Sequence, residues 1–541
     1  MTYDTSNKAR RTVLKTVGAA GLVGMAGCLG GDDSNESGNG NGNGNGNGDD
    51  NPEDRDRSEQ ERVPHATIAI NDDPTRDDWN HYGGVIPYWT NILEPLVWVS
   101  NEMELVPWLA SDWEQTGELT WEFSLREGVQ FHNGEEVTAD EVIFSFETIL
   151  DEWVWAPGWL HIESGNIVAL DEYTVEFTTT DPFPTFPGTI AHNLVAIQHP
   201  DRDHTEDRVI GTGPFQLEEI EQHQEVRTSA FEDYWNDEPI LEELTFRVIE
   251  DPNTRTLSLE NREIDVALAP PRSRIASIES DDSLYLDRQN RPGAGYAGIN
   301  IHKSPTDDVA LRQALNHAIS QETTVDTILE GVGDPGRGPI SPIIYWSAHD
   351  EITDYEKDDD RAADLVSESD YDGESLEILV ANDLVDGREM AQVIQGSLDG
   401  IGVNSDIQVL ERSAFSEAER DGEAHLILQE RGSNSGDADY IIYEGFHSEG
   451  DLNQRLYEEE GTGLHNLGGE VDDLIEQGFQ TGDEDEKATA YKEAQQHIVD
   501  QAVTIPLYYS EFIAAAHENI DGAELGAIPQ FSRWTDLEHW E

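Results

Sequence analysis

Short stretches in which apolar and polar residues alternate with a period of two recur along the chain and predict β-strands. The clearest examples in the first half are residues 120–125, 173–177 and 244–248, and a fourth strand is expected at 265–268. Because these strands are separated by stretches of different periodicity, the pattern already argues against an all-β protein.

Helix starts lie between these strands. Thr138-Ala139-Asp140-Glu141 reads as a capping box, and the apolar residues that follow it recur at helical spacing up to Leu150. Asp251-Pro252 places a capping residue and a first-turn proline before a second helix, which should reach about Arg262.

The second half contains a strand–helix–strand pattern. Residues 376–380 and 407–410 are apolar strands, and residues 387–398 form an amphipathic helix between them. Such an order predicts a parallel strand pair joined by a crossover helix. A further helix at 485–500 leads into an apolar strand at 504–509. The expected fold class is therefore α/β with mixed sheets.

The N-terminus has the features of an export signal. Arg10 and Arg11 precede a weakly apolar run at 17–26, which is too short for the roughly 20 residues that span a bilayer. The run ends in small residues before Cys28, the only cysteine, as in a lipobox where a lipid is attached. Residues 1–27 are thus expected to be a twin-arginine lipoprotein signal peptide, with a lipid anchor on the extracellular face of the cell membrane.

Residues 28–63 are rich in Gly, Asn and acidic residues, so they cannot bury apolar surface and are expected to form a disordered tether. The remaining body, of about 480 residues, is too long for a single hydrophobic core and should divide into two or three lobes.

The charge is extremely one-sided. The chain has 113 Asp and Glu against 32 Lys and Arg, a formal net charge of -81. This charge excludes nucleic acid as a partner. Molar salt shortens the screening length to about 3 Å, which would relieve the repulsion between the acidic groups. Together with the scarcity of lysine, the charge predicts a halophilic protein of the archaeal type.

Several segments of the body resemble, in their order, family 5 of the extracellular solute-binding proteins, the oligopeptide, dipeptide and nickel-binding components of ABC importers. The matching segments are Leu93-Glu94-Pro95-Leu96-Val97, residues 105–110 with Trp113, residues 123–134 followed by 138–142, Gly211-Thr212-Gly213-Pro214-Phe215, Tyr234-Trp235, residues 246–249, Asp308-Val309 with 312–315, and Ile505-Pro506-Leu507-Tyr508. Most of these residues should be scaffold: Asn133-Gly134 suits a tight turn, and Gly211 and Gly213 allow close backbone approach.

The resemblance implies a two-lobed periplasmic-binding-protein-like fold (type II, cluster C) with mixed sheets and an extra inserted domain. The implied parts are lobe I at 64–98, 208–293 and 504–541, the inserted domain at 99–207, and lobe III, the second ligand-binding lobe, at 294–503. Hinge strands would pass near 297–300 and 503–505. The implied partners are a small ligand of the oligopeptide or dipeptide class and an ABC permease with its ATPase subunits, and the protein would be a monomer.

In peptide-binding members of the family, a lobe III motif carries an Asp that pairs with the free amino group of the peptide. Phe446-His447-Ser448 sets the register, which places the family's Trp on Arg431 and its anchor Asp on Asn434. A neutral Asn cannot balance a buried ammonium group, and leaving such a charge unpaired is costly. Asp437 or Asp439 could take over this role, or Arg431 could meet a carboxylate or a sugar. The tentative ligand-binding residues are Arg431, Asn434, Ser435, Asp437 and Asp439.

Other functions are less well supported by the sequence. It contains no catalytic motif of the zinc-protease, serine-hydrolase or P-loop type, so no enzyme activity and no cofactor are expected. His199 and His204 could ligate nickel but lie in a polar loop, and no metal site is expected. Residues Trp153, Trp155 and Trp159 could line a pocket, although core packing is the better interpretation. A receptor that presents ligand to a sensor, and a carbohydrate, carboxylate or nickel-complex ligand, remain open as alternatives.

Overall fold

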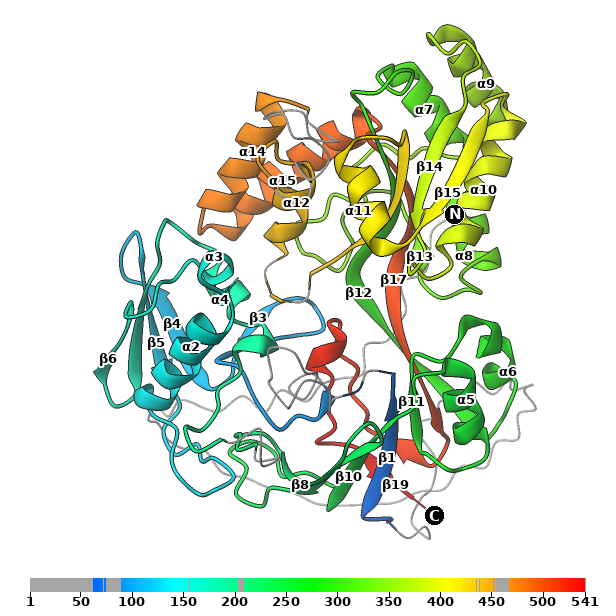
Figure 1. The fold of residues 1–541 in the computed structure, drawn as a ribbon. Coiled ribbons are helices and arrows are strands. Elements are labelled where there is room, and N and C mark those ends of the chain that lie inside the picture. The colour runs from blue at the N-terminus through cyan, green and yellow to red at the C-terminus, as the bar shows by residue number, and fades with distance from the viewer. Residues whose placement is uncertain are drawn as a thin grey trace, which may run out of the picture. The chain divides into compact units, whose positions relative to one another are not determined.

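The computed structural model describes residues 62–71, 73, 89–154, 156–202, 209–433, 435–436, 438–450, 453 and 467–540. The predicted export signal with Arg10 and Arg11, the lipidation residue Cys28 and nearly all of the tether lie outside the described residues. The fold is mixed α/β, as the sequence predicts (Figure 1).

An 11-stranded mixed sheet runs through the described chain in the order β15-β14-β16-β12-β17-β11-β1-β10-β9-β8, with β13 paired to β17. Its strands are β1 (His65–Ile70), β8 (Phe215–Glu221), β9 (Glu225–Ala230), β10 (Glu243–Val248), β11 (Val266–Leu268), β12 (Leu284–Ile299), β13 (Asp334–Pro335), β14 (Leu376–Ala381), β15 (Ser405–Leu410), β16 (Leu426–Arg431) and β17 (Thr504–His517). The predicted parallel pair is confirmed, because β14 and β15 run parallel and α10 (Gly387–Gly400) connects them.

The two long strands β12 and β17, of 16 and 14 residues, pair antiparallel (Figure 1). They are shared by two regions of the sheet, in which different strands flank them. Residues 294–299 of β12 also pair with β16, which leads on to β14 and β15; we call this region the β14 side. Residues 514–516 of β17 pair with β11, which leads on to β1, β10, β9 and β8; we call this region the β1 side.

A β-bulge marks the change from one side to the other, because the β12–β17 register shifts between Asn290 and Ala294. The hinge strands predicted near 297–300 and 503–505 pair with each other, and residues 297–299 also pair with β16 on the β14 side. Their role as hinges stays a prediction. Their apolar character reflects burial in the core of that side and gave no indication of where the sheet neighbours change.

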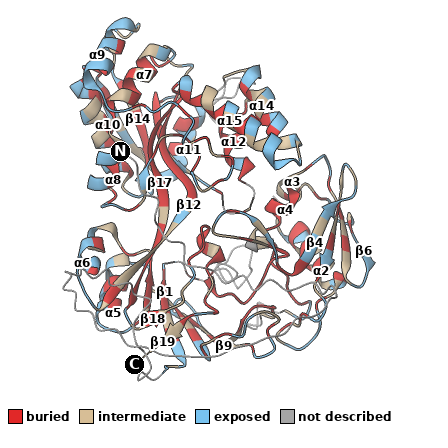
Figure 2. Ribbon diagram, turned by 180° about the vertical axis from the view of Figure 1, so that it is seen from behind, coloured by how far each residue is buried: buried red, intermediate tan, exposed pale blue. Residues whose placement is uncertain are grey.

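Helices cover both faces of the β14 side. One face packs against α7 (Val309–Ala318), α9 (Asp359–Glu368) and α10, and the other against α12 (Asp439–Phe446), α14 (Gly469–Gln480) and α15 (Glu484–Asp500). Figure 2 shows β14, most of β17 and the end of β12 on the β14 side buried, whereas the outward faces of α9 and α14 are exposed. The remaining helices here are α8 (Gln321–Thr327) and α11 (Arg412–Arg420).

A separate four-stranded antiparallel sheet has the order β4-β5-β7-β6. Its strands are β4 (Ala110–Gln115), β5 (Thr120–Leu125), β6 (Ile167–Asp171) and β7 (Thr174–Thr178). Helix α2 (Ala139–Glu152) buries Phe146 against this sheet. The predicted capping box is confirmed: the Thr138 side chain accepts from the first turn, and Glu141 accepts from the backbone N–H of Thr138.

The shorter elements complete the described chain. They are β2 (Val97–Val99), β3 (Leu105–Pro107), α3 (Ala156–Leu160), α4 (Phe186–Thr189), η3 (Asn193–Val195), α5 (Pro252–Glu260), η5 (Arg272–Arg274), α6 (Ile275–Glu279), β18 (Ile520–Asp521), η6 (Pro529–Phe531) and β19 (Glu538–His539). The predicted cap of α5 is confirmed, because the Asp251 side chain accepts from the backbone N–H of Thr254. No helix within the described ranges is long and apolar enough to cross a membrane.

Candidate ligand-binding site

A buried carboxylate gathers most of the short motifs in the first half of the chain. Glu94 is 2% exposed and accepts four hydrogen bonds. Its Oε1 accepts from Trp108 Nε1 at 2.7 Å and from the Tyr234 hydroxyl at 2.8 Å. Its Oε2 accepts from the Thr212 hydroxyl at 2.8 Å and from Trp235 Nε1 at 3.1 Å. Segments up to 141 residues apart therefore meet at one side chain.

This arrangement is typical of a scaffold. Burial raises the pKa of Glu94, and its four hydrogen-bond donors oppose that shift. Burial raises the pKa of Tyr234 well above its ordinary value, and the neighbouring Glu94 carboxylate adds to the increase. Since each carboxylate oxygen already accepts two hydrogen bonds, Glu94 has little capacity left for a ligand.

The two glycines of the Gly211-Thr212-Gly213 segment allow the backbone to approach this cluster closely. A Cβ at Gly211 would overlap the carbonyl oxygen of Ile92, and one at Gly213 would overlap that of Asn91. The predicted reason for these glycines is thus confirmed, and it explains how Thr212 reaches Glu94.

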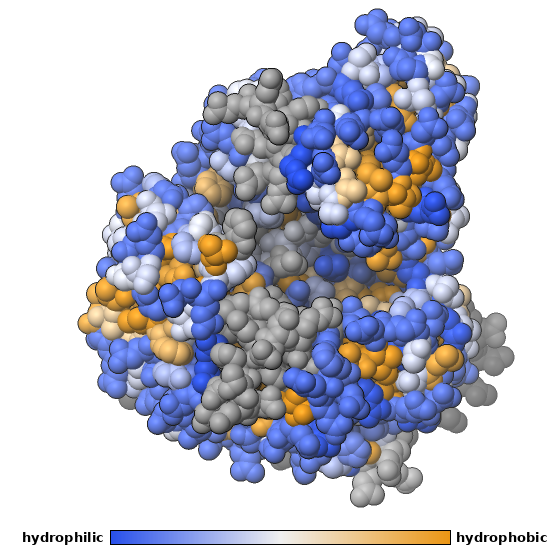
Figure 3. Space-filling model, viewed as in Figure 1, coloured by the Kyte–Doolittle hydropathy of each residue, from blue (hydrophilic) through white to orange (hydrophobic). Residues whose placement is uncertain are grey.

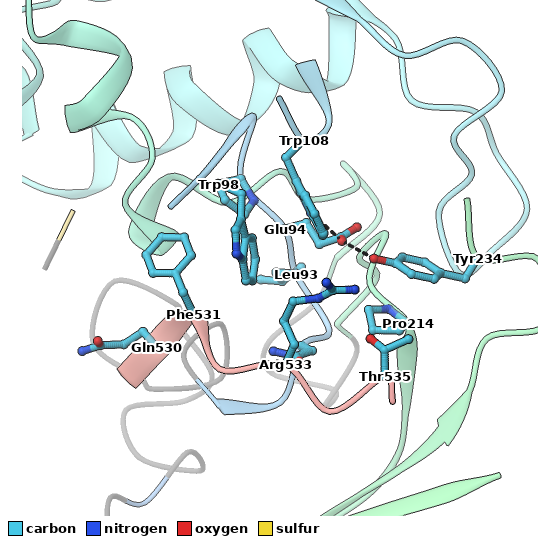
Figure 4. A pocket seen from close by; sticks show the side chains of 12 residues that line it. Leu93, Glu94, Trp98, Trp108, Pro214, Tyr234, Gln530, Phe531, Arg533 and Thr535 are labelled. Carbon is cyan, nitrogen blue, oxygen red and sulfur yellow. Dashed lines mark hydrogen bonds between the residues drawn. The ribbon is translucent and has the colours of Figure 1, made fainter. Parts of the chain in front are cut away.

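Figure 4 shows a small pocket beside Glu94. Trp98, Trp108 and Phe531 line it, and the Arg533 guanidinium lies 5.2 Å from the centre of the Trp108 ring. The accessible space inside it is about 10 Å³, roughly what one water molecule requires. This pocket is therefore too small for a solute of dipeptide size.

The predicted ligand segment connects β16 to α12. Arg431 is the last residue of β16; its Nε donates to Gln429 Oε1 at 3.0 Å, and its Nη2 lies 3.8 Å from Glu419 Oε1 on α11. Burial raises the pKa of the neighbouring Tyr296, and the Arg431 guanidinium opposes that shift. The structure thus places Arg431 in a polar cluster on the β14 side, and its contact with a ligand stays a prediction.

Two other predicted residues of this segment are buried. Ser435 donates its backbone N–H to the Ser433 hydroxyl at 3.2 Å, which tightens the turn. Asp439 begins α12, is 4% exposed and forms an ion pair with Lys487 of α15. Burial raises the pKa of Asp439, and Lys487 opposes that shift. Asn434 and Asp437 lie outside the described residues, so their roles also stay predictions.

The same segment contacts the region of the small antiparallel sheet. Gly436 lies so close to Leu105 of β3 that a Cβ would overlap the Leu105 side chain, and it also lies near Gly188 of α4. Phe479 of α14 packs on Phe183 with ring centroids 6.2 Å apart. Gly436 of the predicted ligand segment therefore lies against β3 and α4, and α14 contacts the same region through Phe479.

The aromatic and histidine residues that the sequence singled out have structural contacts. Trp153 and Trp159 pack on each other with centroids 5.4 Å apart, at the edge of a hydrophobic core. His199 forms a hydrogen bond with the Glu135 carboxylate. Residues Trp155 and His204 lie outside the described part of the chain. Among the residues that are described, no group of three or more His, Cys, Asp or Glu is arranged to hold a metal ion.

The fold and the order of these motifs can be compared with known families. The profile of "Bacterial extracellular solute-binding proteins, family 5 Middle" matches residues 104–453, which is more than half of the chain. The chain belongs to this family. Family 5 proteins are extracellular solute-binding proteins, so the predicted family and the predicted solute-binding function are confirmed.

Individual family 5 relatives bind different solutes. The chain is 27% identical over 458 residues to the dipeptide-binding protein of Escherichia coli (strain K12), a match that covers 77% of this chain and 83% of the relative. It is 25% identical to heme-binding protein A of Haemophilus influenzae, covering 77% and 81% respectively. The crystal structure of a nickel ABC transporter protein from Bacillus halodurans superimposes with a TM-score of 0.78 at 26% identity, covering 88% of this chain and 100% of that one. This superposition confirms the predicted two-lobed fold class.

The sequence missed one feature of this site. It identified Leu93–Val97, Trp108, Thr212 and Tyr234-Trp235 as separate motifs but did not predict that all of them meet at Glu94. The sequence did contain a signal for this cluster: an acidic residue lies inside an otherwise apolar segment, and later motifs are rich in indole and hydroxyl donors.

Proposed function

We propose that this chain is the substrate-binding component of an ABC importer. It would capture a small solute between a lobe built on the β1 side and a lobe built on the β14 side, and deliver it to a permease. The observation that carries this proposal is the strand pair β12–β17, which is shared by both sides in a family 5 chain. A ligand that contacts both sides would favour their closed arrangement.

The proposed lobes follow the ranges predicted from the sequence: lobe I from 64–98, 208–293 and 504–541, the inserted domain from 99–207, and lobe III from 294–503. The bulge at the end of the 208–293 range supports the boundary at 293. The proposed ligand-contacting residues are Arg431, Asn434, Ser435, Asp437 and Asp439, in the segment where β16 leads into α12.

The ligand is proposed to be a peptide-like or other small organic solute. Dipeptides are the ligands named for one relative, and glutathione for others. Asn434 replaces the carboxylate that anchors an amino group in peptide-binding members, so a free amino group should contribute less to affinity here than in those proteins. We propose no catalytic step.

The proposed setting is the outer face of the cell membrane of a halophile. A lipid on Cys28 would hold the protein there, and residues 28–63 would connect the lipid to the folded body. The protein would act as a monomer. The supporting observation for this setting is the charge of -81, which requires concentrated cations for screening. The visible face in Figure 3 is accordingly dominated by hydrophilic residues.

Native mass spectrometry and thermal shift assays test this function. The full chain would be mixed, in about molar KCl, where the screening length is about 3 Å, with dipeptides, glutathione, heme, a nickel–histidine complex and neutral sugars. Retention of one class together with a raised melting temperature is expected, because binding to the folded state stabilises it. If no compound is retained under these conditions, the proposed capture function is wrong.

A further inference from the structure

Polar groups without hydrogen-bond partners in the described chain lie at the bulge where the neighbouring strands of β12 change. Arg291, Pro292 and Gly293 form this bulge between the paired residues Asn290 and Ala294. A bulge redirects the side chains that it contains, and bulges are common beside functional sites. This one lies where the β1 side meets the β14 side, which is where a solute held between two lobes would be placed.

Beside the bulge, polar side chains of β16 and β17 meet across β12, which lies between them. Glu430 of β16 and Tyr508 of β17 both lie opposite Gly295 of β12. Because Gly295 has no side chain, the Tyr508 ring lies across β12, and its hydroxyl donates to Glu430 Oε2 at 2.9 Å. A Cβ at Gly295 would overlap the Tyr508 ring. The glycine therefore permits a hydrogen bond that spans three strands.

Arg291 reaches the same carboxylate but leaves donors unused. Its Nη1 lies 3.7 Å from Glu430 Oε1, which is longer than a hydrogen bond. Its Nε is buried and has no hydrogen-bond partner among the described residues, although the side chain as a whole is 33% exposed. A guanidinium group has five N–H donors arranged to match a carboxylate. Arg291 is thus only partly satisfied.

A second unused donor lies on β17, opposite the bulged residues of β12. The Ser510 hydroxyl of β17 is buried without a hydrogen-bond partner in the described chain, and Ser510 is 7% exposed. The hydroxyl fills the space beside Gly293: a Cβ there would overlap it and would lie 3.5 Å from Glu430 Oε1. Buried polar groups are almost always paired, so two unpaired groups around one glycine require an explanation.

Positive charge is also concentrated here, in a chain that has little of it. Arg272 of η5, on the β1 side, forms an ion pair with Asp386 at the start of α10, on the β14 side. Burial raises the pKa of the Tyr508 hydroxyl and Glu430 adds to this, whereas Arg272 and Arg291 both oppose the increase. Two guanidinium groups therefore act on this one phenol, although the whole chain has only 32 Lys and Arg.

We propose that Arg291 and the Ser510 hydroxyl bind a carboxylate of the transported solute, so that the ligand of this protein is a small organic acid or a peptide with a free carboxyl terminus. This inference rests on the proposed solute-binding function. Arg291 would donate from Nε and one Nη to the ligand, while Glu430, held by Tyr508, orients the opposite edge of the guanidinium. Among the solutes named for the relatives, dipeptides, glutathione and heme all carry carboxylates.

Matched acids and amides provide the test. The full chain in about molar KCl would be mixed with alanyl-alanine and its C-terminal amide, glutathione and its diamide, lactate and lactamide, and neutral sugars, and retention would be measured by native mass spectrometry and calorimetry. At least one acid should bind about tenfold or more tightly than its amide, since a hydrogen bond to a charged group is worth that factor. Arg291→Gln should remove this preference, Arg291→Lys should keep part of it, and Glu430→Gln should strengthen binding of the acid.

Arg274→Gln is the matched control, because Arg274 also has a buried Nε without a partner in the described chain but pairs with Glu260, away from the bulge. It should leave the acid preference unchanged. If acids and amides bind equally, or if Arg274→Gln lowers the acid preference as much as Arg291→Gln does, the carboxylate site is wrong while solute capture stands. If no compound of any class is retained, both proposals fail.

Discussion

The Glu94 cluster and the β12 bulge both contain charged side chains, yet they differ in burial and in how fully those side chains are paired. Glu94 accepts two hydrogen bonds on each carboxylate oxygen, from four residues in three separate segments. Arg291 has one long ion pair and a buried Nε without a partner in the described chain. A saturated charge stabilises the fold, whereas an unsaturated one retains hydrogen-bonding capacity for a solute. The first region should therefore control stability and the second affinity.

The largest effect is expected from Glu94→Ala. Removing the carboxylate leaves buried indole and hydroxyl donors unpaired, so the free energy of unfolding should fall by about 3–5 kcal/mol. Chemical denaturation in molar salt would measure this. Glu102→Ala, at an exposed position nearby, is the control and should change stability little. Equal losses in the two variants would show that Glu94 is not a scaffold centre.

The next effect concerns the ion pair that fixes the start of α12. Lys487→Met leaves the carboxylate of Asp439 buried without its cation, which should cost about 3 kcal/mol of unfolding free energy. Lys492→Met is matched to it on the same helix, because Lys492 pairs with Glu351 at the surface, where such pairs contribute about 0–1 kcal/mol. A surface-like loss for Lys487→Met would contradict the buried pair.

Gly295→Ala tests the hydrogen bond that spans three strands. The added methyl group overlaps the Tyr508 ring, so we expect a loss of about 1–3 kcal/mol in unfolding free energy. Gly396→Ala on α10 serves as the reference, since its Cβ meets no atom within 4 Å and should be neutral or slightly stabilising. Thermal unfolding of both variants in the same buffer would separate the two cases.

Asn434→Asp should alter specificity with little effect on stability. If position 434 is the proposed anchor, a carboxylate there would pair with the amino group of a peptide, so affinity for alanyl-alanine relative to its N-acetyl form should rise about tenfold, or about 1.4 kcal/mol. Calorimetry measures the ratio. Asn404→Asp adds the same charge at an exposed position on the β14 side and should leave it unchanged. An unchanged ratio in both variants would mean that the motif register is wrong.

The smallest effect on stability is expected at Arg291, in contrast to the large effect expected at Glu94. Arg291→Gln should change the unfolding free energy by less than about 0.5 kcal/mol, as is usual for residues with few contacts, even though it abolishes the acid preference. Denaturation and calorimetry on the same preparation would show this. A loss comparable to that of Glu94→Ala would assign Arg291 to the scaffold and remove the distinction between the two regions.

Local features of this fold were predictable because they depend on neighbouring residues. The capping box at Thr138, the cap at Asp251 and the parallel pair β14–β15 each follow from spacing within a few turns of chain. The Glu94 cluster was not predictable in this way, because its donors come from distant segments. The Asp439–Lys487 pair was missed for the same reason: its partners are 48 residues apart, and both resemble ordinary surface charges in such an acidic chain.

The place of β17 in the chain has a consequence for how the protein is made. This strand lies between β12 and β11 in the sheet, yet it spans Thr504–His517 near the end of the sequence. Until the ribosome has released these residues, the edges of β12 and β11 that pair with β17 in the folded protein have no partner. Unpaired strand edges can pair with other chains. Neither side can complete its sheet during synthesis. A chain that stops before residue 504 should therefore aggregate instead of forming one folded lobe.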